Sequence, residues 1–475
     1  MFEYNIQIKP NCIDKKTTEW YNCNVYILSN LKEIYNMKKK ASDFRYNTGE
    51  TKVPWPAVGE NYNAHDLMEV IKFMMQGQGA EYDAAVDAVA EKVFELDKVS
   101  RAPGKLSLDV NVVAAEEACD EYLNTQGSLF VTNATAGFEI AYKYANIGPG
   151  DEVIVPAITF IATMAYPLAV GAKIVICDVA PNTINMDPED LKKKLSPKTK
   201  MVVPVHIGGY PCNMEEIMKV TKEYNKDIIV LEDSAHAFGA MYKGKRIGTI
   251  GDFGAFSFHE VKNVTSFGEG GIVCTNVEEI RPMMARCRFF GSDFGAKPID
   301  NWFYNVDAMP GKYGPFVALN SSTTEIQAIG LKLQVARNEQ IIAERRKNAA
   351  YLTERFKGID ALIPQDIGGD DVQPTFHLYL LQIDPAKAGG DVQVLRKKLE
   401  AKGVTNLPHF GPLYRFNILK QLGYDTEAMS ASCPVANEVF DHRFTHLPLY
   451  GLDEEQVKYM ADAVIEAVEE MQKGL

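Results

Sequence analysis

The chain has 475 residues, of which 46% are hydrophobic and 24% charged, so it is long enough for two or three domains with buried cores. Its formal net charge of −13 argues against nucleic acid as a partner, because binding to phosphates needs a basic surface. The longest apolar stretch, residues 157–172, is shorter than the roughly 20 residues that cross a bilayer, so we expect no membrane segment.

The first residues and the cysteines indicate the compartment. Residues 1–16 lack the basic and then apolar segments of a secretory signal, so we expect a cytoplasmic protein. Eight cysteines are scattered along the chain without a CxxC pair, and Cys177 and Cys274 lie in strand-like apolar runs. This pattern favours reduced thiols in the core over disulfide bonds or a metal site.

From about residue 128 the chain alternates short apolar runs with helix-length segments. Apolar spacing of three and four predicts helices between the runs, for example over 135–145 and 214–224. The alternation predicts an α/β fold, with a mostly parallel seven-stranded sheet and helices on both faces. The predicted strands are residues 128–133, 151–158, 173–179, 199–206, 227–233, 253–259 and 270–276.

One connection breaks this alternation. Only ten residues separate the last two predicted strands, fewer than a parallel crossover requires, so we expect that pair to be antiparallel. Lys262 then lies on a loop at a strand end, where open α/β sheets place their ligands.

The chain changes character after residue 320. Residues 325–356 form a long helical pattern suited to bridging two domains, and a strand and two helices follow at 376–384, 392–403 and 454–471. We therefore expect three parts: an N-terminal extension over 1–50, a large α/β domain over 51–335, and a small α+β domain over 336–475.

Lys262 stands alone between the apolar run FGAFSF and a glycine cluster. A lysine there is either a buried ion-pair partner or a nucleophile, and its small and apolar neighbours would lower its pKa as carbonyl chemistry demands. If the electrophile is pyridoxal phosphate, the chain must also supply a phosphate site, an anion opposite the ring nitrogen and an apolar surface for the ring face.

Each demand has a candidate. The turn from strand 128–133 into helix 135–145 offers backbone N–H groups to a phosphate, with Thr135 and Ala136 first, and Ser257 could add a hydroxyl. The alternative is an ordinary turn that Asn133 or Thr135 caps.

The ring has three further candidates. Asp233 ends an apolar run and could hold the proton on the ring nitrogen, His236 could bond the phenolic oxygen, and Phe160 could cover the ring face. Taken singly, they also suit a cap residue, a structural histidine and a core aromatic residue.

These residues, in this order, resemble the DegT/DnrJ/EryC1/StrS family of sugar aminotransferases, which are pyridoxal-phosphate enzymes of fold type I. The likeness runs from about residue 52 to the carboxyl end. Its most specific stretches are residues 148–163, 231–248, 256–271, 319–331 and 409–415.

The resemblance implies a role for each candidate. Lys262 matches the lysine that forms a Schiff base with the cofactor and moves the proton, and Asp233 matches the partner of the ring nitrogen. Asn320 matches a residue that reaches the neighbouring subunit's phosphate site, which implies a homodimer with shared active sites. His409 and Tyr414 fall in the matched stretch and are candidate substrate residues. The other cofactor-binding residues implied are Thr135, Ala136, Phe160, His236 and Ser257.

The implied reaction moves an amino group from glutamate or glutamine to a keto sugar, nucleotide-linked, or to a keto-cyclitol. A subset of the family has histidine in place of the lysine and removes a hydroxyl instead, so Lys262 favours transamination. Two alternatives stay open: a pyridoxal-phosphate sugar dehydratase or lyase, and a regulatory protein that keeps the fold without turnover. The long segment 288–320 suits either substrate choice or subunit packing.

Overall fold

The computed structural model describes residues 62–100, 106–292 and 306–475. The predicted N-terminal extension, residues 1–50, lies outside the described residues. Internal contacts divide the chain into two units, and the boundary in the sequence is between residues 104 and 105. The described part of the first unit contains the helices α2 (Ala64–Met74) and α3 (Ala80–Asp97), and the Asn63 side chain caps α2 by accepting from the backbone of His65 and Asp66.

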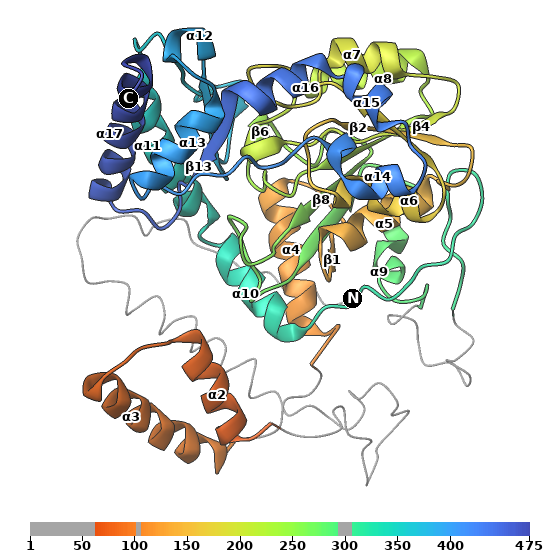
Figure 1. Ribbon diagram of the computed structural model, residues 1–475. Coiled ribbons are helices and arrows are strands. Elements are labelled where there is room, and N and C mark those ends of the chain that lie inside the picture. The colour runs from red at the N-terminus through yellow and green to blue at the C-terminus, as the bar shows by residue number, and fades with distance from the viewer. Residues whose placement is uncertain (1–61, 101–105, 293–305) are drawn as a thin grey trace. The chain divides into compact units, whose positions relative to one another are not determined.

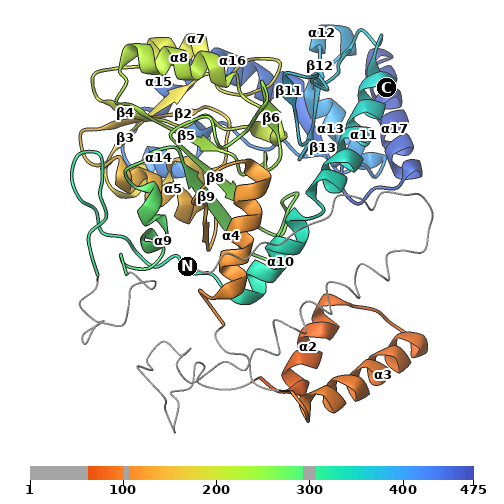
Figure 2. The same ribbon diagram turned by 180° about the vertical axis from the view of Figure 1, so that it is seen from behind.

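The second unit is built on a seven-stranded sheet, seen in Figures 1 and 2. All neighbouring strands run parallel except β9, which runs antiparallel to both of its neighbours, β1 and β8. The seven predicted strands and the antiparallel pair are thereby confirmed. In spatial order the strands are β1 (Leu129–Val131), β9 (Gly271–Thr275), β8 (Phe253–Ser257), β5 (Ile229–Asp233), β4 (Thr199–Val202), β2 (Glu152–Pro156) and β3 (Lys173–Cys177).

Helices cover both faces of this sheet, because alternate residues of a strand point to opposite sides. Val153 and Val155 of β2 pack in the core beneath α5 and α6, whereas Ile154 between them packs in the core beneath α7 and α8. The covering helices are α4 (Val110–Leu123), α5 (Ala134–Tyr144), α6 (Ala162–Ala169), α7 (Pro188–Lys194), α8 (Met214–Tyr224), α9 (Met284–Cys287) and α10 (Glu325–Val335).

The long helical pattern over 325–356 forms two helices. α10 ends at Val335, and α11 (Asn338–Phe356) begins after Arg337, whose ψ of 11° is not helical. Beyond α11, a three-stranded antiparallel sheet packs against helices around a core of its own. Its elements are β10 (Leu362–Ile363), β12 (Tyr379–Ile383), β13 (Phe444–Leu447), α12 (Pro385–Ala388), α13 (Val392–Ala401) and α17 (Glu454–Gln472).

One late segment belongs to the large sheet instead. Helices α14 (Asn417–Gln421), α15 (Thr426–Ala431) and α16 (Pro434–Glu438) lie beside α6, α7 and α8 in Figure 1, and Leu419 and Ala436 are buried in the core of that sheet. The small region after α11 therefore returns to the large sheet before it closes with β13 and α17. The domain boundary at residue 336 stays a prediction.

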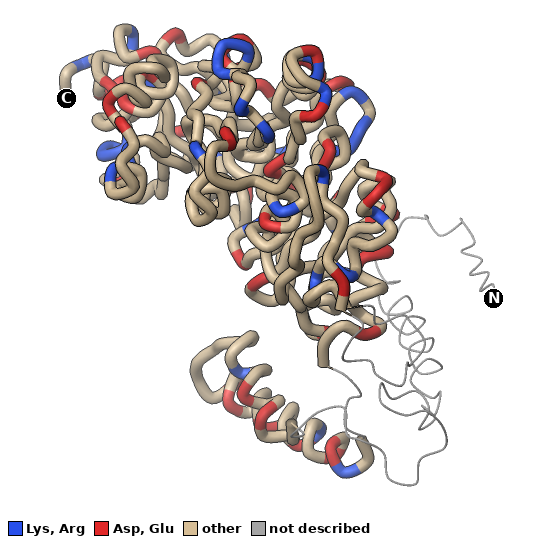
Figure 3. The backbone as a smooth tube through the Cα atoms, turned by 90° about the vertical axis from the view of Figure 1, so that its right-hand side faces the viewer, with Lys and Arg blue, Asp and Glu red and all other residues tan. Residues whose placement is uncertain are grey.

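Cysteines and charges complete the description. The described cysteines are buried free thiols, and the described residues contain no group of three or more side chains suited to a metal ion. Within the same residues, no helix combines the length and apolar character needed to cross a membrane. Figure 3 shows acidic and basic residues interspersed along the chain.

Candidate active site

A cavity of about 1010 Å³ opens where the strands of the large sheet end. One wall comes from the segments that follow β1, β2, β5 and β8, and the other comes from α11 and from residues 377–378, 407–410 and 448–450. The cavity brings together seven of the predicted residues, which the sequence spreads over 275 positions: Thr135, Phe160, Asp233, His236, Ser257, Lys262 and His409.

Lys262 lies on the turn between β8 and β9. Its backbone N–H donates to the carbonyl of His259 at 2.9 Å, and the turn is closed by a bond from Phe258 N–H to Gly270 at 2.7 Å. Phe258 and Val264, on either side of the lysine, are fully buried against α4 and α10. The turn therefore holds the lysine backbone in place and leaves its side chain to the cavity.

The amine of Lys262 is suited to act as a nucleophile. Its Nζ makes no hydrogen bond or ion pair with any described residue, although the charge of Asp233 raises its pKa. Burial is the larger effect and lowers the pKa of Lys262 to about 8, so a useful fraction of the amine is neutral near pH 7. Among the described residues Lys262 therefore forms no structural ion pair, which was the alternative that the sequence left open.

Asp233 is the buried carboxylate at the end of β5. Its Oδ2 accepts from the Thr163 hydroxyl at 2.8 Å, and its Oδ1 accepts from the Ala235 N–H at 3.2 Å. Burial raises the pKa of Asp233, while these bonds and the charge of Lys262 act in the opposite direction. A positively charged ring nitrogen in the cavity would favour its ionised form.

The tautomer of His236 follows from its backbone partner. Nδ1 accepts from the Gly208 N–H at 3.2 Å, so the ring proton of the neutral imidazole is on Nε2. Burial and then the positive charge of Lys262 lower the pKa of His236 well below its usual value, so the ring stays neutral. His236 can therefore donate one hydrogen bond from Nε2.

The opposite wall is tied to the sheet by backbone contacts at Gly209. Thr375 N–H donates to the Gly209 carbonyl at 3.0 Å, and a Cβ on Gly209 would lie 2.1 Å from the Thr375 hydroxyl. With a φ of +82°, this position suits only glycine. The close approach brings His377 against His236, with ring centroids 4.3 Å apart.

Asn263, the neighbour of Lys262, strengthens this link. Its Nδ2 donates to the Thr375 carbonyl at 3.4 Å, which leaves Oδ1 to accept from His377 Nδ1 at 3.0 Å. The reactive loop and the opposite wall thus share one hydrogen-bonded unit.

An aromatic surface lines the same space. Phe160, 53% exposed, has its ring centroid 5.4 Å from that of Phe410, which in turn lies 6.0 Å from the His236 ring. A half-exposed phenylalanine in a cavity is available to cover a flat ligand.

The turn before α5 is capped by the chain itself. Asn133 Oδ1 accepts from the Ala136 N–H at 3.0 Å, as in the alternative that the sequence left open. Ala136 does not line the cavity, whereas Ala134 and Thr135 do. A phosphate here would meet Thr135 and the first helical N–H groups, and would reach Ala136 only if Asn133 moved.

Two other candidates lie away from the cavity. Tyr414 is 3% exposed, packs in the core of the large sheet and donates to Asn437 Oδ1 at 2.8 Å, so this chain's own cavity does not include it. Asn320 is exposed on the segment paired with Phe289, and its Oδ1 accepts from the Ser322 N–H at 2.9 Å. Its role in a neighbouring subunit stays a prediction.

These features fit pyridoxal phosphate. The cavity is large enough for a cofactor and a substrate, and it holds an amine with a lowered pKa, a buried carboxylate, a neutral imidazole donor and an exposed aromatic face. Residues Lys262, Asp233, His236, Phe160, Thr135 and Ser257 are those that would hold it.

Comparison with known proteins decides the family. The model of the DegT/DnrJ/EryC1/StrS aminotransferase family matches residues 90–465. The chain belongs to this family. It is therefore a pyridoxal-phosphate-dependent aminotransferase of fold type I, in a family of sugar aminotransferases.

Three relatives illustrate the likeness. The chain is 34% identical over 383 residues to the spore coat polysaccharide biosynthesis protein SpsC of Bacillus subtilis, and the aligned region covers 78% of this chain and 92% of that protein. It is 31% identical over 325 residues to GDP-perosamine synthase of Caulobacter vibrioides, covering 68% and 82%. Spr1654 of Streptococcus pneumoniae, described as a sugar aminotransferase in its PLP-form, superposes with a TM-score of 0.66 at 26% identity, covering 78% and 94%.

Some residues that shape this family member's cavity were missed from sequence. Thr163, at the start of α6, does not line the cavity but donates to Asp233, and its place four residues after Thr159 could have drawn attention to it. Phe410 lies in the matched stretch 409–415 but was not singled out, and no local pattern marks Arg345 and His377.

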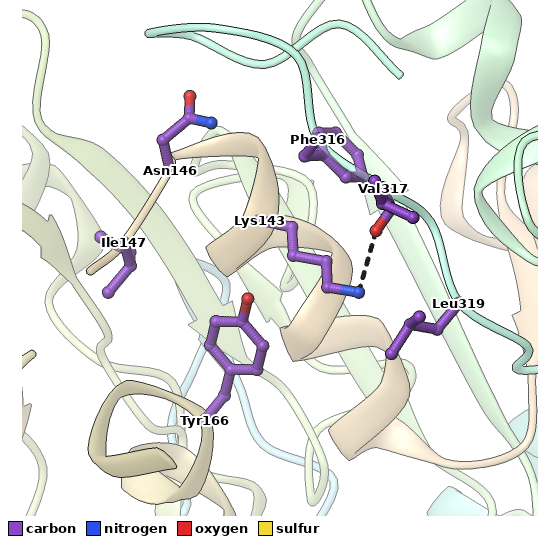
Figure 4. A pocket seen from close by; sticks show the side chains of 7 residues that line it. All are labelled: Lys143, Asn146, Ile147, Tyr166, Phe316, Val317 and Leu319. Carbon is purple, nitrogen blue, oxygen red and sulfur yellow. Dashed lines mark hydrogen bonds between the residues drawn. The ribbon is translucent and has the colours of Figure 1, made fainter. Parts of the chain in front are cut away.

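A second, smaller hollow of about 410 Å³ lies away from the lysine, between α5, α6 and the segment 316–319 (Figure 4). Lys143 crosses it and donates to the Val317 carbonyl at 3.0 Å. Its lining contains none of the predicted site residues, so we assign it no part in the reaction.

Proposed function

We propose that this aminotransferase moves the amino group of glutamate or glutamine to a nucleotide-linked keto sugar or a keto-cyclitol. The proposal depends above all on one observation: the Lys262 amine, with its pKa lowered to about 8, shares a cavity with Asp233 at the end of β5. The family membership and the name of GDP-perosamine synthase support a sugar acceptor.

Pyridoxal phosphate supplies an aldehyde that bonds to amines and a ring that accepts the electrons of the adjoining carbon. Lys262 serves it twice. As a neutral amine it would bond covalently to the aldehyde carbon with loss of water, and once an incoming amine has replaced it there, it would carry the proton from the substrate carbon to C4′. Both tasks need an amine that is neutral near pH 7.

Asp233 holds the proton on the ring nitrogen. Thr163 and Ala235 fix its two oxygens, so the carboxylate keeps one orientation in the cavity. His236 would donate from Nε2 to the phenolic oxygen, since the Gly208 N–H occupies Nδ1.

The remaining contacts orient the cofactor. Phe160 would cover one ring face, and the hydroxyls of Thr135 and Ser257, which line the same cavity, would bind the phosphate beside the amino end of α5. Asn320, exposed on its segment, completes the phosphate site of a second copy in a homodimer.

Reduction with borohydride tests the covalent bond. Protein incubated with pyridoxal phosphate, reduced and digested should carry a pyridoxyl mass on the peptide with Lys262, and an unreduced sample should not. A pyridoxyl mass at another lysine alone, or none, would contradict the assignment.

Product analysis tests the reaction itself. The protein is offered nucleotide keto sugars and keto-cyclitols with glutamate or glutamine, and an amino sugar or amino-cyclitol should form in step with the keto acid. A product that loses water without gaining nitrogen would identify a dehydratase, and absorbance unchanged by any donor would identify a non-catalytic protein.

A further inference from the structure

Arg345 is a buried cation on the wall opposite the lysine. It lies on α11, is 4% exposed and lines the cavity that contains Lys262. Arginine is almost never fully buried in proteins unless it is paired, so its partners need explanation.

Its hydrogen bonds occupy only one part of the guanidinium group. Nη1 donates to the carbonyls of Phe376 at 3.4 Å and His377 at 3.2 Å. Nε is buried without a partner, and Nη2 makes no hydrogen bond to a described residue. Nε and Nη2 form one edge of the planar group, which is the geometry that binds a carboxylate through two parallel hydrogen bonds.

No carboxylate of the described chain balances this charge. Burial lowers the pKa of Arg345 to about 10, against the opposite effects of Tyr450 and then of Glu344, which is exposed and next to it on α11. The guanidinium lies over the ring of Tyr450, 4.9 Å from the ring centre. The other acids that line the cavity are Asp233, Glu260 and Glu269, and none forms an ion pair with Arg345.

A short series of contacts connects Arg345 to the loop that carries Lys262. Arg345 holds the carbonyl of His377, whose ring packs on His236 and bonds to Asn263 beside Lys262. An anion on Arg345 would thus face the cavity from the wall opposite the amine, and hydrogen bonds tie that wall to the loop of Lys262.

We propose that the Nε and Nη2 edge of Arg345 binds the α-carboxylate of the amino donor. This inference rests on the proposed function, because it names the part of the donor that the same cavity recognises. A carboxylate supplies one planar charge for one unpaired cation. The diphosphate of a nucleotide sugar carries more charge and would call for several cations, whereas the other arginine in the described lining is the exposed Arg337.

The test measures the donor half-reaction alone. Holoenzyme is mixed with L-glutamate or L-glutamine, or with the matching α-carboxamide, and the cofactor absorbance gives a dissociation constant and a rate for each. The variants are Arg345→Gln and Arg345→Lys, and the control is Arg346→Gln, whose arginine is on the same helix, donates to the Pro374 carbonyl and does not line the cavity.

We expect Arg345→Gln to weaken the binding of the amino acid donor about 100-fold and to leave the affinity for the α-carboxamide unchanged. The variant would then no longer distinguish the two compounds. Arg345→Lys should lose part of this preference, and Arg346→Gln should keep all of it. The lysine variant retains the buried charge and decides the question if the glutamine variant does not fold.

Three outcomes would overturn the inference. The wild type could bind the acid and the carboxamide equally, or both Arg345 variants could keep the wild-type preference. Alternatively, the variants could weaken only the second half-reaction with the nucleotide keto sugar, which would identify a diphosphate ligand. A wild type that converts no donor at all would instead remove the proposed function, and this inference with it.

Discussion

The two sides of β5 carry adjacent acids with opposite surroundings. Glu232, on the closed side, is fully buried and accepts from the N–H groups of Gly248, Ile250 and Gly251 at 2.6–2.8 Å. His206 adds a bond from Nε2 at 3.3 Å, since its Nδ1 accepts from the Cys212 N–H. Every oxygen of Glu232 is therefore occupied by the chain itself.

Asp233, on the open side, which faces the cavity, accepts side-chain hydrogen bonds from only Thr163 and Ala235 among the described residues, and it lines the cavity with Lys262. The comparison teaches that burial alone does not mark a functional acid in this sheet. An acid whose bonding capacity the fold has filled holds loops in place, and an acid that keeps capacity beside a cavity is available to a ligand. Substitutions should separate the two sides.

The largest effect is expected on the open side, at Lys262→Ala. Because this removes both the nucleophile and the proton carrier, turnover should fall at least about 10⁴-fold. Stability should not fall with it, since Nζ has no hydrogen bond to lose. Activity assays and denaturant unfolding of the same preparation measure both quantities. Full activity in this variant would remove the assignment.

The same variant has a pH signature in the cofactor-free protein. The pKa of Lys262 is lower in the folded chain, about 8, than its ordinary value of 10.5, so burying the charged amine costs stability below pH 8. The wild type should gain stability relative to Lys262→Ala as the pH rises from about 8 towards 10.5. An equal gain in both proteins would show that the lysine is not desolvated.

The next effect is expected at Asp233→Asn, which should lower turnover about 10²- to 10³-fold because the ring nitrogen loses its anion. The charge of Asp233 raises the pKa of Lys262, so the variant should also shift the capture of pyridoxal phosphate to lower pH. In the wild type the capture rate should rise with pH and level off above about 8. Stopped-flow absorbance of the two cofactor-free proteins measures both midpoints, and an upward shift in the variant would contradict the effect of the Asp233 charge on the pKa of Lys262.

The closed side should respond in stability instead. In Glu232→Gln an amide nitrogen faces groups that themselves donate, so the free energy of unfolding should fall by about 3 kcal/mol. The pH midpoint of cofactor capture should stay near that of the wild type, because Glu232 does not reach the cavity. A midpoint that moves as far as in Asp233→Asn would mean that the two sides are not separate.

The sequence predicted the cavity residues at the strand ends better than those on the opposite wall, which α11 and residues 377–378 form. Lys262, Asp233 and Phe160 follow apolar strands, and in a parallel sheet such ends meet at one edge, so their meeting could be inferred. Ala136 was less predictable, because whether its N–H is free depends on the side-chain conformation of Asn133.

Longer-range packing was not predictable at all. Tyr414 lies in a matched stretch, yet a single turn at 413–415 directs it into the core. Arg345 and Arg346 are neighbours in a charged helix, and only the packing of residues 374–377 against α11 buries one of them beside the cavity. No local pattern carries that information.

The smallest effect is expected at His236, which contributes one hydrogen bond from a neutral imidazole. The bond from the Gly208 N–H leaves only Nε2–H to face the cavity. His236→Gln keeps a donor at that reach and should stay within about threefold of wild-type turnover, whereas His236→Phe should lose about tenfold with its single neutral hydrogen bond. Because burial and Lys262 keep the pKa of His236 well below its usual value, neither variant should change the pH profile between 6 and 8. A profile that loses a step in both variants would show that the imidazole titrates there, and His236 would then act as an acid or base and not as a fixed donor.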